Sequence, residues 1–273
     1  FFLTFILVLS IQNPMHGEYR LNETNDELAS SKTPSLELLF FGNSFTSNNQ
    51  LTGHVSDMMD QGGWNPDIVT KTSGGKTISW HAEEAGQDNS EWDSALNSFR
   101  DYVIIQDQSQ VPGFPTNSNY YQESLDGAQY IDSRAANINA GTILFMTWGY
   151  RNGDSNNEFR YPDYLTMQDH LKNGYQMFAE NLTTNERQAF IAPVGLAFKH
   201  IFSKVENQGI EPTNDGTSFS NLFASDDSHP SIDGTYLASC VFYATITGAS
   251  PVGLSNEGVT ISDERALELQ QAA

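Results

Sequence analysis

Three residues far apart in the sequence have the types that nucleophilic catalysis requires: Ser44, Asp226 and His229. A serine hydroxyl becomes a strong nucleophile when a histidine takes its proton and a carboxylate orients that histidine. Asp226 precedes His229 by three residues, so a turn can bring its carboxylate to Nδ1–H and leave Nε2 free for the serine. One short segment could therefore supply both the base and its orienting group.

The segment 226–229 also allows two other interpretations. Asp226, Asp227 and Ser228 could form the N-cap of a helix, because Asp and Ser satisfy the free N–H groups there. Asp226, Asp227 and His229 could also bind a metal, but no further ligands follow at a recognisable spacing. We expect neither a metal nor an organic cofactor. The other histidines fall in a polar lead-in or in helical patterns: His16, His54, His81, His170 and His200.

The elements around Ser44 predict an α/β protein. The apolar run 38–41 ends at Gly42 and Asn43, which is typical of a strand buried on both faces. Similar runs alternate with helical patterns, which favours a parallel sheet covered on both faces. The expected strands are residues 36–41, 67–72, 102–105, 142–147 and 189–194. The expected helices begin near Leu51 and cover a region from Trp80 to Phe99 and residues 120–137, 163–181, 196–206, 232–247 and 263–270.

Polar clusters follow these strands and should meet at one edge of the sheet. Such an edge is where open α/β sheets bind their ligands. Gly75 could present a backbone N–H to a developing oxyanion, and Gln106 or Gln108 could add a side-chain amide. Turn formation alone would also explain the glycine and the glutamines.

Composition excludes some partners. The chain has 273 residues and a net charge of -21, which disfavours nucleic acid, anionic membranes and anionic substrates. Its single cysteine, Cys240, rules out an intramolecular disulfide and is expected to be a buried, inert thiol. The sequence leaves the oligomeric state open.

The first residues suggest secretion. Residues 1–11 are almost entirely apolar but shorter than the roughly 20 residues of a membrane span. They are typical of the apolar core of a secretory signal peptide, and no cysteine follows for a lipid anchor. We therefore expect a signal-peptide remnant and polar lead-in at 1–34, a domain at 35–273, and an extracellular or periplasmic protein without a stable membrane anchor.

Taken together, the motifs resemble the SGNH/GDSL hydrolases. The resemblance rests on Gly42-Asn43-Ser44, Gly75, a polar amide after the third strand, and Asp226-x-x-His229, in that order. It implies a flavodoxin-like three-layer α/β/α sandwich and ester hydrolysis by a serine esterase. Ser44 would be the nucleophile, His229 the base and Asp226 its orienter. The N–H groups of Ser44 and Gly75 would bind the oxyanion.

Two blocks depart from the usual pattern of that family. Asn43 replaces the aspartate of Gly-Asp-Ser, and Gln106-Asp107-Gln108-Ser109 replaces Gly-x-Asn-Asp. Alignment of the strand ends puts Gln108 in place of the expected asparagine, with Gln106 as the other candidate. The chain would thus be an atypical branch. It has no Gly-x-Ser-x-Gly elbow, which argues against an α/β-hydrolase.

The substrate is expected to be a small-molecule or carbohydrate ester. Trp148 and Asn43 are candidate substrate-binding residues, and the aromatic side chains of Trp80, Phe114 and Tyr150 could also stack on a sugar. A secreted, Asn-rich chain favours removal of acetyl groups from carbohydrates. The alternatives are a short-chain lipid esterase or lipase of the same family and a non-catalytic secreted carbohydrate-binding protein on this fold.

Overall fold

The computed structural model describes residues 33–273, which form one compact unit. The predicted signal-peptide remnant and lead-in, residues 1–34, lies outside the described residues except for its last two positions. In the part of the chain that is described, no helix is long and apolar enough to cross a membrane.

A five-stranded sheet in the order β2-β1-β3-β4-β5 forms the middle of this unit, and every pair of neighbouring strands is parallel. The strands are β1 (Ser35–Gly42), β2 (Asn65–Thr72), β3 (Tyr102–Ile105), β4 (Gly141–Phe145) and β5 (Ala189–Ala192). The predicted α/β fold with about five parallel strands is confirmed. Because β1 lies between β2 and β3, the loops after these three strands share one edge.

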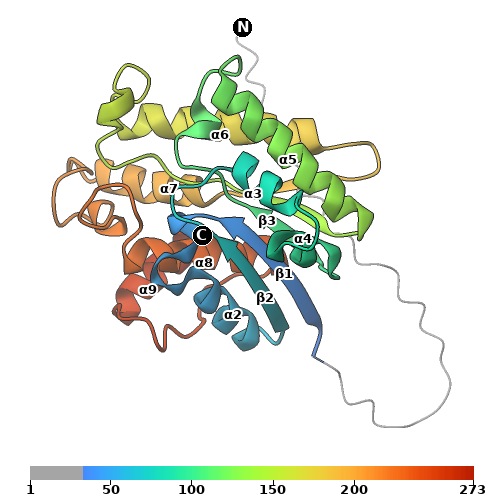
Figure 1. Cartoon of the computed structure of the whole chain (residues 1–273). Coiled ribbons are helices and arrows are strands. Elements are labelled where there is room, and N and C mark those ends of the chain that lie inside the picture. Colours follow the sequence, from blue (N-terminus) through green and yellow to red (C-terminus); the bar gives the residue numbers. More distant parts are fainter. Residues whose placement is uncertain (1–32) are drawn as a thin grey trace, which may run out of the picture. The chain divides into compact units, whose positions relative to one another are not determined.

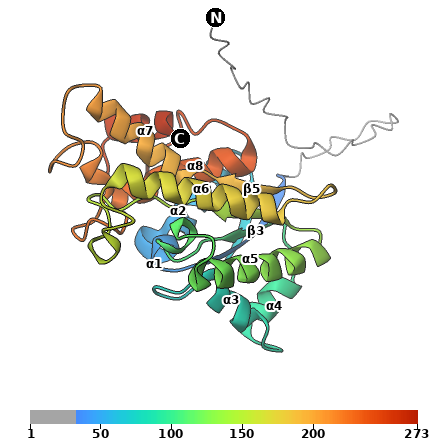
Figure 2. The ribbon, with the colours of Figure 1, turned by 90° about the horizontal axis from the view of Figure 1, so that it is seen from above.

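Helices cover both faces of the sheet, which makes three layers (Figure 1, Figure 2). One face packs against α3 (Ile78–Ala85), α4 (Glu91–Asn97), α5 (Asn119–Asn137) and α6 (Tyr164–Leu182). The other packs against α2 (Leu51–Gln61), α7 (Val194–Glu206), α8 (Ile232–Thr247) and α9 (Asp263–Ala272). Short helical turns complete the unit: α1 (Ser44–Ser47) and the 3-10 turns Asn48–Gln50, Val111–Gly113, Ser155–Asn157 and Ser220–Leu222.

Alternate residues of β1 point into the two layers. Leu38 and Phe40 join the core beneath α7 and α8, whereas Leu39 and Phe41 join the core beneath α3 and α5. All four are fully buried. Burial of such side chains contributes roughly 1.5–3 kcal/mol each, so this strand is firmly held and its end is a fixed platform for the residues that follow.

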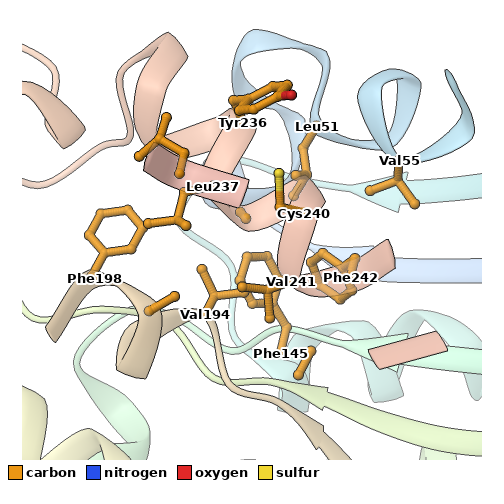
Figure 3. Packing of buried hydrophobic residues seen from close by; sticks show 14 of the residues in the cluster. Leu51, Val55, Phe145, Val194, Phe198, Tyr236, Leu237, Cys240, Val241 and Phe242 are labelled. Atoms are coloured by element: carbon orange, nitrogen blue, oxygen red, sulfur yellow. The ribbon is translucent and has the colours of Figure 1, made fainter. Parts of the chain in front are cut away.

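The helix α8 is buried on almost all sides because it lies against the sheet and contacts α2, α7 and α9. Figure 3 shows Phe242 and Val241 of α8 beside Phe145 of β4, with Leu237 near Phe198. Cys240 belongs to this cluster, is fully buried, and has a pKa raised by burial. The predicted burial of this free thiol is confirmed.

Several predicted boundaries were wrong. The fourth strand was expected at 142–147, but β4 ends at Phe145. The helical region expected from Trp80 to Phe99 is divided into α3 and α4, because Asn89 adopts a left-handed φ of 62° and Ser90 caps a new helix. Phe99 lies beyond α4. The fifth strand was expected to reach residue 194, but Pro193 is already the N-cap of α7.

Candidate active site

The site begins at the turn that follows β1. Asn43 is the N-cap of α1, and its side-chain oxygen accepts a hydrogen bond from the N–H of Phe45 at 3.0 Å. Ser44 is the first residue of that helix, and its N–H donates no hydrogen bond among the described residues. A Cβ on Gly42 would collide with Thr46 Oγ1 and Gln106 Oε1, so only glycine fits there. The turn therefore presents Ser44 on a tightly packed support.

Ser44 lies at one end of a hydrogen-bonded chain of side chains. Its Oγ is 2.8 Å from His229 Nε2, and His229 Nδ1 is 2.5 Å from Asp226 Oδ2. Asp226 Oδ1 also accepts hydrogen bonds from the N–H groups of His229 at 2.9 Å and Ser228 at 3.1 Å. Partial burial opposes ionisation of Asp226, but these hydrogen bonds and His229 together lower its pKa to about 2. Asp226 is thus a carboxylate at ordinary pH, held against the imidazole.

The helix-cap interpretation of residues 226–228 was wrong. The N-cap of α8 is Ser231, whose side chain accepts a hydrogen bond from the N–H of Gly234. Within residues 33–273, no group of three or more His, Cys, Asp or Glu side chains could hold a metal ion. Of the three interpretations, the geometry thus favours the Asp–His pair.

The turn that carries Asp226 and His229 is anchored by the loop after β4. The guanidinium of Arg151 pairs with the carboxylate of Asp227 at 3.0 Å. The backbone N–H of Arg151 donates to the carbonyl of Asp227 at 2.8 Å. Asp227 adopts a left-handed φ of 60°, as a tight turn requires. Asp227 points to Arg151 and Asn152, whereas Asp226 contacts His229.

Trp148 does not lie where a substrate could reach it. The side chain is fully buried and stacks between Phe45 at 4.8 Å and Phe198 at 4.4 Å between ring centroids. Its Nε1–H donates to the carbonyl of Ser228 at 3.0 Å. The prediction of a substrate-binding role is therefore corrected: Trp148 packs between α1 and α7 and supports the turn before His229.

Asn43 is also a supporting residue and not a surface for substrate. It is almost fully buried, and its Nδ2 donates to the carbonyl of Lys76 at 3.1 Å. The N–H of Ser73 donates to the carbonyl of Gly42 at 3.1 Å. Both bonds join the loop after β2 to the turn of Ser44. That loop contains Gly75, with a φ of 68° and an N–H that donates no hydrogen bond among the described residues.

Gln106 does not serve as an oxyanion donor, because both ends of its amide are engaged in the interior. Its Oε1 accepts from the N–H of Asn43 at 2.8 Å and from Thr46 Oγ1 at 2.9 Å, and its Nε2 donates to the carbonyl of Asp107. The side chain is fully buried. Gln106 thus stabilises the turn of Ser44 through its hydrogen bonds to Asn43 and Thr46.

Gln108 is engaged as well. Its Nε2 donates to Gln110 Oε1, and its Oε1 accepts from the N–H of Gln110 at 3.0 Å. The expectation of an oxyanion donor is therefore corrected for the fully buried Gln106, whereas for Gln108, whose amide contacts Gln110 in this structure, it stays a prediction. Backbone N–H groups of Ser44 and Gly75 remain as the candidate donors.

Two buried titratable residues behind the site were not singled out by the sequence. His81 Nε2–H donates to the carbonyl of Gly42 at 2.9 Å, and its Nδ1 accepts from Trp92 Nε1 at 2.9 Å. Burial lowers the pKa of His81 to about 4, so the ring is neutral at ordinary pH. The sequence shows only a histidine in a helical pattern, and no local signal reveals its long-range partners.

The second of these residues is Asp107, directly after β3. Its Oδ1 accepts from the N–H groups of Ile78 at 2.9 Å and Gln108 at 2.8 Å. Burial raises the pKa of this carboxyl to about 6. Because Ile78 begins α3, Asp107 fixes the helix that follows the Gly75 loop.

The three-layer fold and the hydrogen-bonded serine, histidine and aspartate together define the class of structures that this protein resembles. The fold is that of the SGNH hydrolases, as the sequence motifs implied. Neither a protein-family model nor a curated protein matches the chain. The likeness appears among solved structures.

Three of these structures illustrate it. A DUF4886 family protein from Bacteroides uniformis has a TM-score of 0.68 at 18% identity, covering 87% of this chain and 93% of its own. A candidate SGNH hydrolase from Slackia heliotrinireducens has a TM-score of 0.59 at 20% identity, covering 78% of this chain and 99% of its own. A variant of Axe2, an acetyl-xylooligosaccharide esterase of Geobacillus, has a TM-score of 0.55 at 18% identity, covering 81% and 97%.

Proposed function

We propose that this protein is a secreted serine ester hydrolase that removes short acyl groups, acetyl above all, from carbohydrate esters. The observation that carries the proposal is the continuous chain from Ser44 Oγ through His229 to Asp226. Serine hydrolases on unrelated folds use the same three groups, hydrogen-bonded from serine to histidine to aspartate. The solved structures of similar fold include an esterase of acetylated xylo-oligosaccharides, which supports the choice of substrate class.

In the proposed reaction, His229 Nε2 takes the proton of Ser44 as its Oγ attacks the ester carbonyl. Asp226 holds the imidazole in the required tautomer and stabilises the imidazolium. The N–H groups of Ser44 and Gly75 bind the oxyanion, and His229 returns the proton to the departing alcohol. Water activated by His229 then attacks the acyl group on Ser44, and the acid is released. Each backbone donor to the oxyanion is worth roughly 3 kcal/mol.

Hydrolysis of 4-nitrophenyl acetate by the wild type and by Ser44→Ala tests the proposal. Loss of the nucleophile should reduce kcat by a factor of about 10⁴ or more. Ser44 is partly exposed and an alanine fits its place, so circular dichroism should show the variant folded. Equal rates for both proteins would show that Ser44 is not the nucleophile. Binding of sugars without turnover would favour the non-catalytic alternative.

Chain-length preference separates the carbohydrate esterase from a lipid esterase. We expect acetylated xylo-oligosaccharides to be hydrolysed with a higher kcat/KM than nitrophenyl esters of long acids. A preference for acyl chains beyond about eight carbons would overturn the carbohydrate assignment. Secretion is tested separately by N-terminal sequencing of the protein recovered from the medium of expressing cells.

A further inference from the structure

A polar cavity of about 590 Å³ lies next to Asp226, whereas Ser44 and His229 are not among the residues that line it. It is bounded by the loop after β4, by Gln110 and by the turn that carries Asp226. Asp226 contributes to its wall and is hydrogen-bonded to His229, so the cavity begins one side chain away from the imidazole. Its volume lies in the usual range for sites of organic ligands.

The wall of this cavity is held in place by buried hydrogen bonds. Asp154 is almost fully buried and accepts from Gln110 Nε2 at 3.1 Å and from the N–H of Asn156 at 3.0 Å. Tyr161, also buried, donates from its hydroxyl to the carbonyl of Gln110 at 2.8 Å. Tyr150 OH lies 2.6 Å from Ser109 Oγ. The cavity is therefore a preformed feature of the fold.

The side chains that line it select for a particular chemistry. Among the residues described, no Lys or Arg lines the cavity, whereas Asp154, Glu158, Asp226 and Asp227 do. An anionic ligand would meet the carboxylates of Asp154, Glu158 and Asp226, because Arg151, the cation beside this wall, is already paired with Asp227. The amides and carboxylates of the wall and the partly exposed ring of Tyr150 can bind the hydroxyls of a sugar. They provide little apolar surface for a long acyl chain. Asn156 and Glu158 are exposed, and their side chains make no hydrogen bond among the described residues.

We propose that this cavity binds the alcohol part of the ester and accepts neutral, hydroxyl-rich sugars while rejecting anionic ones. The cavity is too large and too polar for an acetyl group, so the larger alcohol part of the substrate occupies it. This inference rests on the proposed esterase function. Asn156 and Glu158 then determine specificity, through contacts with sugar hydroxyls, and take no part in the chemistry at Ser44.

The first experiment compares two substrates in the double variant N156A/E158A. The readout is the ratio of kcat/KM for acetylated xylotriose to kcat/KM for 4-nitrophenyl acetate, which is too small to fill the cavity. Loss of two hydroxyl contacts should lower this ratio about tenfold. Both positions are exposed, so the fold should tolerate the change.

The second experiment tests selection by charge with Glu158→Lys. Its substrates are an acetylated neutral xylo-oligosaccharide and the same ester bearing a uronic acid. The wild type should prefer the neutral ester. The variant should raise the relative kcat/KM of the anionic ester about fivefold at low salt, with a smaller effect at high salt. Glu123→Lys is the matched control, because Glu123 is exposed on α5 outside the cavity and the change in net charge is identical.

The outcomes separate the two proposals. Two ratios of kcat/KM are measured: sugar ester to nitrophenyl ester in N156A/E158A, and anionic to neutral sugar ester in Glu158→Lys. Ser44-dependent hydrolysis with both ratios shifted as described supports the cavity assignment. Ser44-dependent hydrolysis with both ratios unchanged, or a control that shifts as much as Glu158→Lys, overturns it and leaves the esterase function standing. Stronger activity on an ester with an amine-bearing alcohol than on the sugar ester also overturns it. Absence of Ser44-dependent hydrolysis overturns the proposed function and the cavity's role with it.

Discussion

At the scale of single residues, two neighbouring aspartates have different partners. Asp226 contacts His229, whereas Asp227 pairs with Arg151. We therefore predict that Asp226→Asn lowers kcat by roughly 10³–10⁴-fold because the imidazole loses its orienting carboxylate. Asp227→Asn should cost less than about tenfold, since it weakens only the support of the turn. Steady-state kinetics on 4-nitrophenyl acetate measure both, and the reverse ranking would assign the orienting role to the other carboxylate.

The two glutamines after β3 provide a second test at this scale. Gln106→Leu removes the acceptor of two buried donors, Asn43 N–H and Thr46 Oγ1, so it should destabilise the protein by about 2 kcal/mol and lower kcat. Gln108→Leu should lower kcat less than about tenfold, because its amide is bonded to Gln110. Urea unfolding and kinetics check both. A loss of about 10²–10³-fold in a folded Gln108→Leu variant would restore Gln108 to the oxyanion hole.

At the scale of elements, the apolar runs and turn residues predicted most of the fold. The third strand was predicted without error, as was the helix α8, because Ser231 and Gly248 mark its ends. The elements also indicated that Ser44 would follow a buried strand. Long-range partners were beyond prediction, since no local pattern shows that Gln106 lies beneath Asn43 or that Trp148 fills the space between two helices.

The turn after β1 makes a prediction about glycines. A Cβ at Gly42 would collide with Thr46 and Gln106, whereas a Cβ at Gly74 would meet no atom within 4 Å. Gly42→Ala should therefore destabilise the protein by about 1–3 kcal/mol and displace Ser44, with a loss of kcat. Gly74→Ala, in the loop that follows β2, is the matched control. Thermal unfolding of the two variants should differ clearly, and equal melting temperatures would contradict the packing described.

At the scale of the whole molecule, the three layers bury titratable groups that link stability to pH. Burial raises the pKa of folded Asp107 to about 6, above the ordinary aspartate pKa of 3.8. Between these values the folded state binds more protons than the unfolded state, so this residue contributes stability at low pH that is lost as the pH rises through 6. His81 acts in the opposite direction, because its folded pKa of about 4 lies below the ordinary histidine pKa of 6.5.

We predict that Asp107→Asn changes this balance. The asparagine cannot ionise, so the free energy of unfolding of the variant relative to the wild type should increase by about 2–3 kcal/mol between pH 4 and pH 7. Denaturant unfolding at several pH values measures the difference, and the other ionisable groups cancel in the comparison. A constant difference across this range would show that Asp107 is not held with a raised pKa.

The central claim is that Ser44 is an activated nucleophile, and covalent capture tests it most directly. A fluorophosphonate forms a stable adduct with a serine whose proton is removed by a neighbouring base. Incubation followed by peptide mass spectrometry should place the adduct on Ser44 in the wild type, with slow labelling in His229→Ala and none at this position in Ser44→Ala. An adduct on another residue, or a wild type that remains unlabelled, would contradict the account.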